Sequence, residues 1–275
     1  MERRKFLAAA GTGMLVGVAG CNSESGESGD PTSANPPGES SDFQVPPPEA
    51  DLPDGWELKT SDTEPHVLLE DSRLGVDYKA IGHSRRFEDT ALRERVRKEL
   101  FGRFDRALVV GFASHVDLEV LGGNLTESFV LKATDKIQNE AESAFRAQMK
   151  EFGLQNISKI DPYQAQGNRS PSEFQRFTAS YSVDSVEIDD VDIPNIEEES
   201  FRLGSGQLEV AGLLATHQRD DEILVTGGMY PNENYTRSKE WEITGGVDLD
   251  LTVDLGLRPN LHRSDIVNFA RNVYV

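Results

Sequence analysis

The stretch "LEVAGLLATHQRDDEILVTGGMY", residues 208–230, decides the fold because it contains two apolar segments and the connection between them. Residues 208–216 and 222–230 have the length and composition of buried β-strands. The polar residues 217–221 separate them. Two apolar runs joined by a short polar stretch predict an antiparallel hairpin.

Further strands are predicted on both sides of this hairpin. Phe177, Ala179, Tyr181 and Val183 alternate with polar residues, as in a half-buried strand. Residues 247–257 show the longest alternation in the chain, which predicts a strand with one face in the core and one in solvent. Earlier strands are predicted at residues 56–60, 66–69, 74–83 and 107–113.

Three helices are predicted from apolar residues at helical spacing. The first covers residues 90–104, with Asp89 as its N-cap and with Leu92, Val96, Leu100, Phe101 and Phe104 on its buried face. The second covers residues 125–152, with Asn124 and Glu127 as a capping pair. The third covers residues 263–274, after Pro259.

These elements predict an α+β fold, in which helices pack on a largely antiparallel sheet within a single domain of residues 51–275. The element order resembles that of the Mog1/PsbP-like sandwich. The points of likeness are Asp54-Gly55-Trp56, the late hairpin and a terminal helix that contains Phe269. The resemblance implies a fold and no residue roles.

The N-terminal stretch "ERRKFLAAAGTGMLVGVAGC", residues 2–21, precedes this domain. Its apolar part is shorter than the ~20 residues that a membrane-spanning helix needs. Its glycines follow no strand, which argues against a nucleotide-binding loop. A basic start, a short apolar run and small residues before position 21 instead predict a signal peptide over residues 1–20.

Two parts of the signal peptide resemble known export motifs. Arg3 and Arg4 lie in a segment that resembles the twin-arginine motif, with Glu2 where Ser or Thr is usual. Val18-Ala19-Gly20-Cys21 resembles a lipobox, which implies cleavage before Cys21 and lipidation of its thiol. Cys21 is the chain's only cysteine. We therefore expect an exported lipoprotein, anchored through Cys21 at the outer face of the cell membrane.

Residues 21–50 are rich in Ser, Gly, Pro and Glu and poor in apolar side chains. Such a segment cannot bury enough surface to offset the entropy of ordering it. The composition predicts a lipidated, disordered tether between the anchor and the domain.

The net charge of −20 excludes nucleic acid as an expected partner, because phosphate binding needs a basic surface. The acids are spread along the whole chain, and Arg outnumbers Lys by 19 to 9. This composition resembles that of haloarchaeal proteins. It suits high salt, where the Debye length falls to ~3 Å near 1 M and charge repulsion is screened.

One region departs from this acidity. Residues 85–106 hold eight cations against five acids. The cations are Arg85, Arg86, Arg93, Arg95, Arg97, Lys98, Arg103 and Arg106. Arg85, Arg86, Arg93 and Arg97 are therefore candidates for an interaction patch that meets an acidic protein or an anionic ligand. The alternative is that these cations neutralise acidic neighbours within the same fold.

The sequence contains no recognisable catalytic or metal motif. The five histidines lack the spacing of a zinc site, so no metal or other cofactor is expected. Ser114 follows an apolar strand but lacks the glycine pattern of a hydrolase nucleophile. The acidic run 184–199 is a weak candidate for calcium, because it lacks the spacing of a calcium loop.

Four N-x-S/T sequons fit an exported glycoprotein. Asn168 and Asn234 are the better candidates because they lie in loop-like sequence, and Asn156 and Asn124 are the others. Together these features predict a membrane-anchored binding or interaction module of unknown ligand. The alternative is a cell-surface hydrolase with an unrecognised active site.

Overall fold

The computed structural model describes residues 45–62, 64–71, 77–121, 126–188, 201–219, 222–243 and 247–275. The predicted signal peptide with Arg3 and Arg4, the lipidation site Cys21 and the sequon at Asn124 lie outside these residues. So does most of the acidic run 184–199.

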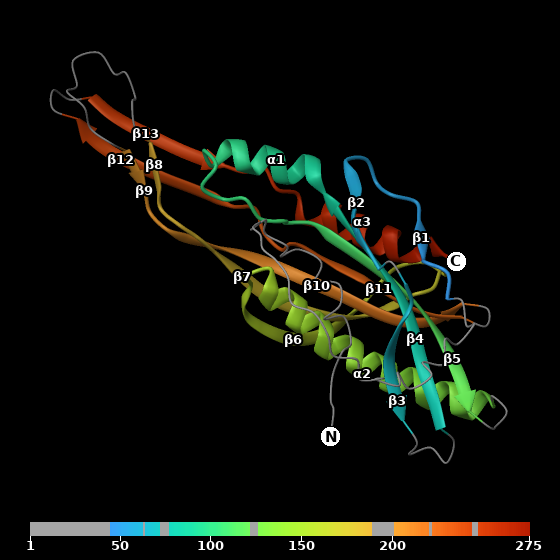
Figure 1. Ribbon diagram of the computed structural model, residues 1–275. Helices are drawn as coiled ribbons and strands as arrows, with labels where there is room; N and C mark the ends of the chain where they lie inside the picture. Colours follow the sequence, from blue (N-terminus) through green and yellow to red (C-terminus); the bar gives the residue numbers. More distant parts are fainter. Residues whose placement is uncertain are drawn as a thin grey trace, which may run out of the picture.

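An antiparallel sheet of eight strands forms the centre of the described structure (Figure 1). Seven strands follow the order β2-β4-β5-β11-β10-β7-β6, and β3 pairs with β4 beside β2. The strands are β2 (Trp56–Ser61), β3 (His66–Asp71), β4 (Asp77–Asp89), β5 (Val110–Leu121), β6 (Gln155–Gln164), β7 (Glu173–Val183), β10 (Gly206–Arg219) and β11 (Glu222–Pro231).

The predicted hairpin is confirmed and lies in the middle of this sheet. Strands β10 and β11 pair from Val210 opposite Pro231 to Arg219 opposite Glu222. The connection is therefore only residues 220–221, and the predicted five-residue loop was too long. The polar residues 217–219 continue the strand because their backbone groups pair with β11 regardless of side-chain polarity.

Strand β5 is also longer than the sequence predicts. It runs through Ser114, His115 and Asp117, because β4 pairs with it along its whole length, from Asp77 opposite Leu121 to Glu88 opposite Val110. Strands β4 and β5 thus carry polar side chains, such as Ser84, Ser114 and His115, into the buried part of the sheet.

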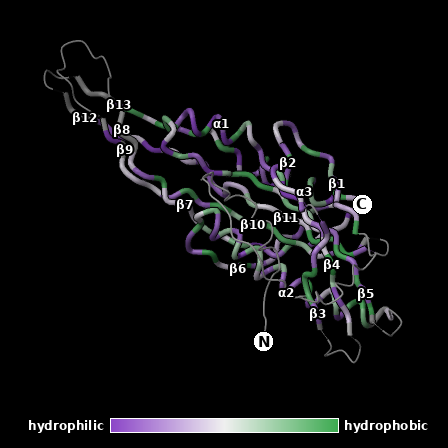
Figure 2. Tube along the Cα trace, in the orientation of Figure 1, coloured by the Kyte–Doolittle hydropathy of each residue, from purple (hydrophilic) through white to green (hydrophobic). Residues whose placement is uncertain are grey.

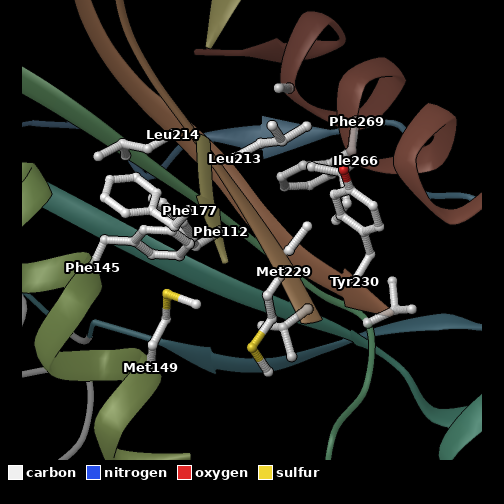
Figure 3. Packing of buried hydrophobic residues seen from close by; sticks show 14 of the residues in the cluster. Phe112, Phe145, Met149, Phe177, Leu213, Leu214, Met229, Tyr230, Ile266 and Phe269 are labelled. Atoms are coloured by element: carbon white, nitrogen blue, oxygen red, sulfur yellow. The ribbon is translucent and has the colours of Figure 1, made fainter. Parts of the chain in front are cut away.

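Two helices cover opposite faces of the sheet, as Figure 3 shows for the core residues. Helix α2 (Glu127–Glu151) packs on one face, where the ring of Phe145 lies against Gly212 of β10. Helix α3 (Pro259–Arg271) packs on the other face, where Ile266 lies against Gly228 of β11. Gly228 pairs with Leu213, the residue that follows Gly212 on β10. Because neighbouring residues of a strand point to opposite faces, the two helices contact opposite faces of the same pair of strands.

The ends of these two helices differ from the prediction. The N-cap of α2 is Thr126, whose Oγ1 accepts a hydrogen bond from the Phe129 amide at 3.3 Å, in place of the predicted Asn124. Helix α3 begins four residues early, because Pro259 occupies its first turn, where the missing N–H is not needed.

Helix α1 (Thr90–Glu99) begins as predicted and ends early. The Asp89 carboxylate caps it by accepting from the Leu92 amide at 2.8 Å. The prediction placed Phe101 on its buried face, but the helix stops before it, because Phe101 and Gly102 adopt positive φ angles of 53° and 75°. The Gly102 amide bonds back to the Arg97 carbonyl at 2.7 Å, which is a glycine-type helix stop.

Two strand pairs form an arm that extends from one end of the body (Figure 1). The arm consists of β8 (Val186–Ile188) with β9 (Phe201–Leu203), and β12 (Thr236–Ile243) with β13 (Val247–Asp254). The prediction for residues 247–257 is therefore only partly right. Strand β13 pairs with β12 outside the main sheet, and Leu255 and Leu257, which enter the core, follow the strand.

The folded domain begins before the predicted boundary at residue 51. Residues 45–50, here called the strap, cross the sheet, and the last two form β1 (Glu49–Ala50), which pairs with β14 (Val273–Tyr274) at the C-terminus. Val45 is buried and its carbonyl faces the His83 ring at 3.1 Å. These contacts stabilise the strap in one conformation, which its proline-rich composition alone does not predict.

The described structure thus confirms an α+β fold with a mostly antiparallel sheet. Figure 2 shows hydrophobic residues concentrated along the central strands, whereas α1 is largely hydrophilic. Within the described residues, no helix combines the length and the apolarity needed to cross a membrane.

Candidate functional site

A hollow of 740 Å³ lies beside α1, between that helix and strands β2 and β4. Two of the predicted interaction residues, Arg93 and Arg97, line it. The structure adds Trp56, Glu88 and Asp105, which the sequence analysis did not select. Helix α1, the start of β2, the end of β4 and the connection after α1 bring these side chains together.

Arg93 is held between two carboxylates of its own fold. Its Nη1 donates to Glu88 Oε1 at 3.2 Å, and its Nε donates to Asp105 Oδ1 at 2.6 Å. Glu88 is buried, and Arg93 supplies it with a hydrogen-bond and ion-pair partner. The hydrogen bond from Arg93 lowers the pKa of the Asp105 carboxyl. Arg93 therefore has a structural role on the floor of the hollow.

The outer face of α1 carries further internal ion pairs. Arg97 Nε and Nη2 donate to Glu94 at 3.0 Å, and this hydrogen bonding lowers the pKa of the Glu94 carboxyl. Lys98 Nζ lies 3.4 Å from the same carboxylate. An anionic partner at this face would have to exchange with these ion pairs.

The other two predicted residues lie elsewhere. Arg85 and Arg86 follow one another on β4, so their side chains point to opposite faces of the sheet. Arg85 donates to the Pro48 carbonyl of the strap at 3.2 Å. Arg86 stacks on the Phe152 ring at 5.4 Å, and burial lowers its pKa. The structure thus brings Arg93 and Arg97 together and separates both from Arg85 and Arg86.

The connection from α1 to β5, residues 100–105, presents a different kind of surface, here called the α1–β5 turn. Phe101 at its tip is 61% exposed, the largest exposed fraction among the large hydrophobic residues of the described chain. Its φ of 53° is unusual for an aromatic residue. Within the described structure, the exposed side chain of Arg103 makes no hydrogen bond or ion pair. The glycine at position 102 was the one sequence signal for this turn.

The remaining chemical candidates are buried or bonded within the fold. Ser114 is buried and its hydroxyl lies 2.8 Å from that of Ser84, its cross-strand neighbour. His83 and His115 lie opposite each other on β4 and β5, and both rings contact carbonyls of the strap. Within the described ranges, no group of His, Cys, Asp and Glu residues is arranged to hold a metal ion.

Three of the four sequons lie in described residues, and they differ in their bonding. The Asn234 side chain donates to Asp254 at 2.7 Å and accepts from the Leu257 amide at 2.8 Å. The Asn156 side chain donates to Ser180 at 3.3 Å. Asn168 is exposed in the loop after β6, and its side chain makes no hydrogen bond within the described part. A glycan at Asn168 would therefore disturb the fold least.

The fold and these surfaces define an α+β domain that presents a charged hollow and an exposed aromatic turn. The chain belongs to the family described as Domain of unknown function (DUF6517), whose model matches residues 44–248. The match begins at the strap and continues into β13, so it includes every surface described above. No curated protein and no solved structure matches the chain.

Proposed function

We propose that this protein is a twin-arginine-exported lipoprotein, held at the outer face of the cell membrane through Cys21, whose domain binds an acidic protein partner. The observation that carries the anchoring is that the chain's one cysteine lies in the lipobox-like Val18-Ala19-Gly20-Cys21. Arg3 and Arg4 support the export route. The acidic composition supports a halophilic setting, and the sequons, Asn168 first, support glycosylation.

The arrangement of the domain supports presentation of a binding surface. The strap, where the chain from the membrane anchor enters the fold, lies at the end of the domain away from the arm (Figure 1). A flexible coil as long as residues 22–44, the part of the predicted tether that precedes the strap, would span ~25–30 Å. The tether thus lets the domain stand clear of lipid headgroups and turn its far surfaces outward.

The α1–β5 turn supports the choice of an acidic protein as the partner. Phe101 is an exposed aromatic residue, and the exposed side chain of Arg103 has no hydrogen-bond or ion-pair partner among the described residues. Aromatic residues and arginine are enriched at the energetic centres of protein interfaces. The nearby cations Arg97 and Lys98 share the single carboxylate of Glu94, which leaves one positive charge in excess among these three groups and favours a partner with a negative surface.

Localisation is tested by two substitutions. Cys21→Ser should move the protein from the membrane fraction to the medium, and Arg3→Lys with Arg4→Lys should stop export. Retention of the Cys21→Ser variant in the membrane fraction would exclude the lipid anchor. Normal secretion of the double lysine variant would exclude the twin-arginine route.

Binding is tested by affinity capture with the domain of residues 45–275 in high salt, followed by mass identification. We expect an acidic protein that is lost with Phe101→Ala and with Arg103→Glu. Leu131→Ala is the matched control, because Leu131 is similarly exposed, at 59%, on the distant helix α2. Equal capture by all three variants would exclude the turn as the binding surface, and capture of a basic partner would exclude the proposed chemistry.

A further inference from the structure

A second hollow, of 590 Å³, is lined by residues at the end of β7 and near the beginnings of β10 and β12. These strand ends lie at the base of the arm (Figure 1). Its lining is polar apart from Val183. The polar and small residues are Ser182, Asp184, Ser205, Gly206, Gln207 and Arg237. None of them belongs to the α1–β5 turn, so this hollow is independent of the proposed partner surface.

Arg237 is held in place by contacts with an aromatic ring and a bare stretch of backbone. Its guanidinium carbon lies 5.2 Å from the centroid of the buried Tyr235 ring. A methyl group added at Gly206 would lie 2.7 Å from both Nε and Nη2, so the guanidinium occupies the space that a side chain there would fill. These contacts restrict the rotamers of Arg237 before a ligand binds, so less side-chain entropy is lost on binding.

This held guanidinium has no acceptor in the described structure. Arg237 is exposed, and among the described residues none of its guanidinium N–H groups has an acceptor and no carboxylate lies within ion-pair distance. Arg93 and Arg97, by contrast, are both paired with acids of their own fold. A planar, five-donor group that faces a hollow without an acceptor matches the geometry of an incoming carboxylate.

The other side chains of the hollow narrow the ligand class. Asp184 lines the hollow without neutralising Arg237, so it disfavours multiply charged anions such as phosphate. Its carboxylate would instead accept a hydrogen bond from a hydroxyl or ammonium group of the ligand. Ser182, Ser205 and Gln207 add donors and acceptors around both groups.

We propose that this hollow binds the carboxylate of a small hydroxy or amino acid, or of a peptide C-terminus, with Arg237 as the anion-binding residue. The carboxylate would bond to the guanidinium in the bidentate manner, and the neighbouring hydroxyl or ammonium group would face Asp184. In high salt the long-range attraction is screened, so recognition would depend on these short contacts.

The test is an NMR titration of the domain of residues 45–275 in concentrated KCl, following the backbone amides. The probes are glycolate, glycine, inorganic phosphate, triglycine with a free C-terminus and triglycine with an amidated C-terminus. We expect saturable shifts at residues 182–184, 205–207 and 237. Glycolate and glycine test a free small acid, and the two peptides test a chain end, for which only the free carboxylate should bind.

Three variants decide the assignment. Arg237→Gln should weaken binding about tenfold or more, because the charged bidentate donor is lost. Gly206→Ala keeps the charge but displaces the guanidinium, and should also weaken binding. Arg169→Gln is the matched control, because it removes an exposed arginine of the β6–β7 loop, and it should leave binding unchanged.

Several outcomes would overturn the proposal. They are the absence of saturable shifts with every probe, binding that persists in Arg237→Gln, and an equal loss of binding in Arg169→Gln. Tighter binding of inorganic phosphate than of glycolate would overturn the ligand class. Amide shifts that stay unchanged outside the hollow will show that each variant is folded.

Discussion

The strap provides the sharpest test of the structure, because the sequence alone assigns residues 45–50 to the tether. Removal of these residues, to give a chain that begins at Asp51, takes away the buried Val45 side chain, which contributes ~1.5–3 kcal/mol. It also leaves the buried His115 Nδ1 without the Pro46 carbonyl, 3.0 Å away, at a cost of ~1–3 kcal/mol. The pairing of β1 with β14 is lost as well.

We therefore expect the shorter chain to lose about 4–6 kcal/mol of unfolding free energy, which is a large part of the 5–15 kcal/mol typical of a domain. Urea unfolding of residues 45–275 and of residues 51–275 in the same KCl solution measures the difference. Val45→Ala should lower the midpoint in the longer chain, and Val67→Ala, the same change at a 42% exposed site, should not. Equal midpoints for the two chain lengths would refute the strap as part of the fold.

Two further predictions concern buried polar groups. The Tyr181 hydroxyl donates to the Ala107 carbonyl at 3.0 Å, whereas the buried Tyr230 hydroxyl has no partner in the described residues. Tyr181→Phe should therefore lower the free energy of unfolding by ~1–2 kcal/mol, and Tyr230→Phe should leave it almost unchanged. A reversed order in urea unfolding would contradict the assignment. Burial lowers the pKa of His262 from 6.5 to about 4. Between these two pH values, this histidine is protonated in the unfolded chain and neutral in the folded chain. Stability should therefore fall, by at most about 3 kcal/mol, as the pH drops from 6.5 to 4. Comparison with His262→Gln isolates this change, and identical pH profiles would exclude it.

The sequence predicted best where a single periodic pattern decided the local structure. The buried stripe of α2, from Ala133 to Met149, follows the helical period and lies in the core as expected. The hairpin of β10 and β11 follows from its two apolar runs. Asp89 caps α1 because capping depends only on residues within one helical turn.

The prediction failed where a distant partner decided the outcome. Phe101 has the right spacing for the buried face of α1, but the helix ends before it, and the glycine-type stop leaves its side chain exposed to solvent. Residues 247–254 alternate perfectly, yet alternation does not say which strand lies alongside, and the partner is β12 in the arm. The strap has the composition of a tether, and its order comes from β4, β5 and β14, far along the chain.

The candidate sites follow the same division. The sequence by itself determined the α+β class, the Asp89 cap of α1 and the distinct N-terminal segment with its one cysteine, because these depend on composition and short-range spacing. Only the tertiary structure decided that Arg93 is bound to Glu88 and Asp105, and that Arg85 and Arg86 lie apart from it. It also decided that Arg237 lines a hollow and that its guanidinium bonds to no acceptor among the described residues. The physical reason is that the pairing of a charge depends on which distant strands meet beside it.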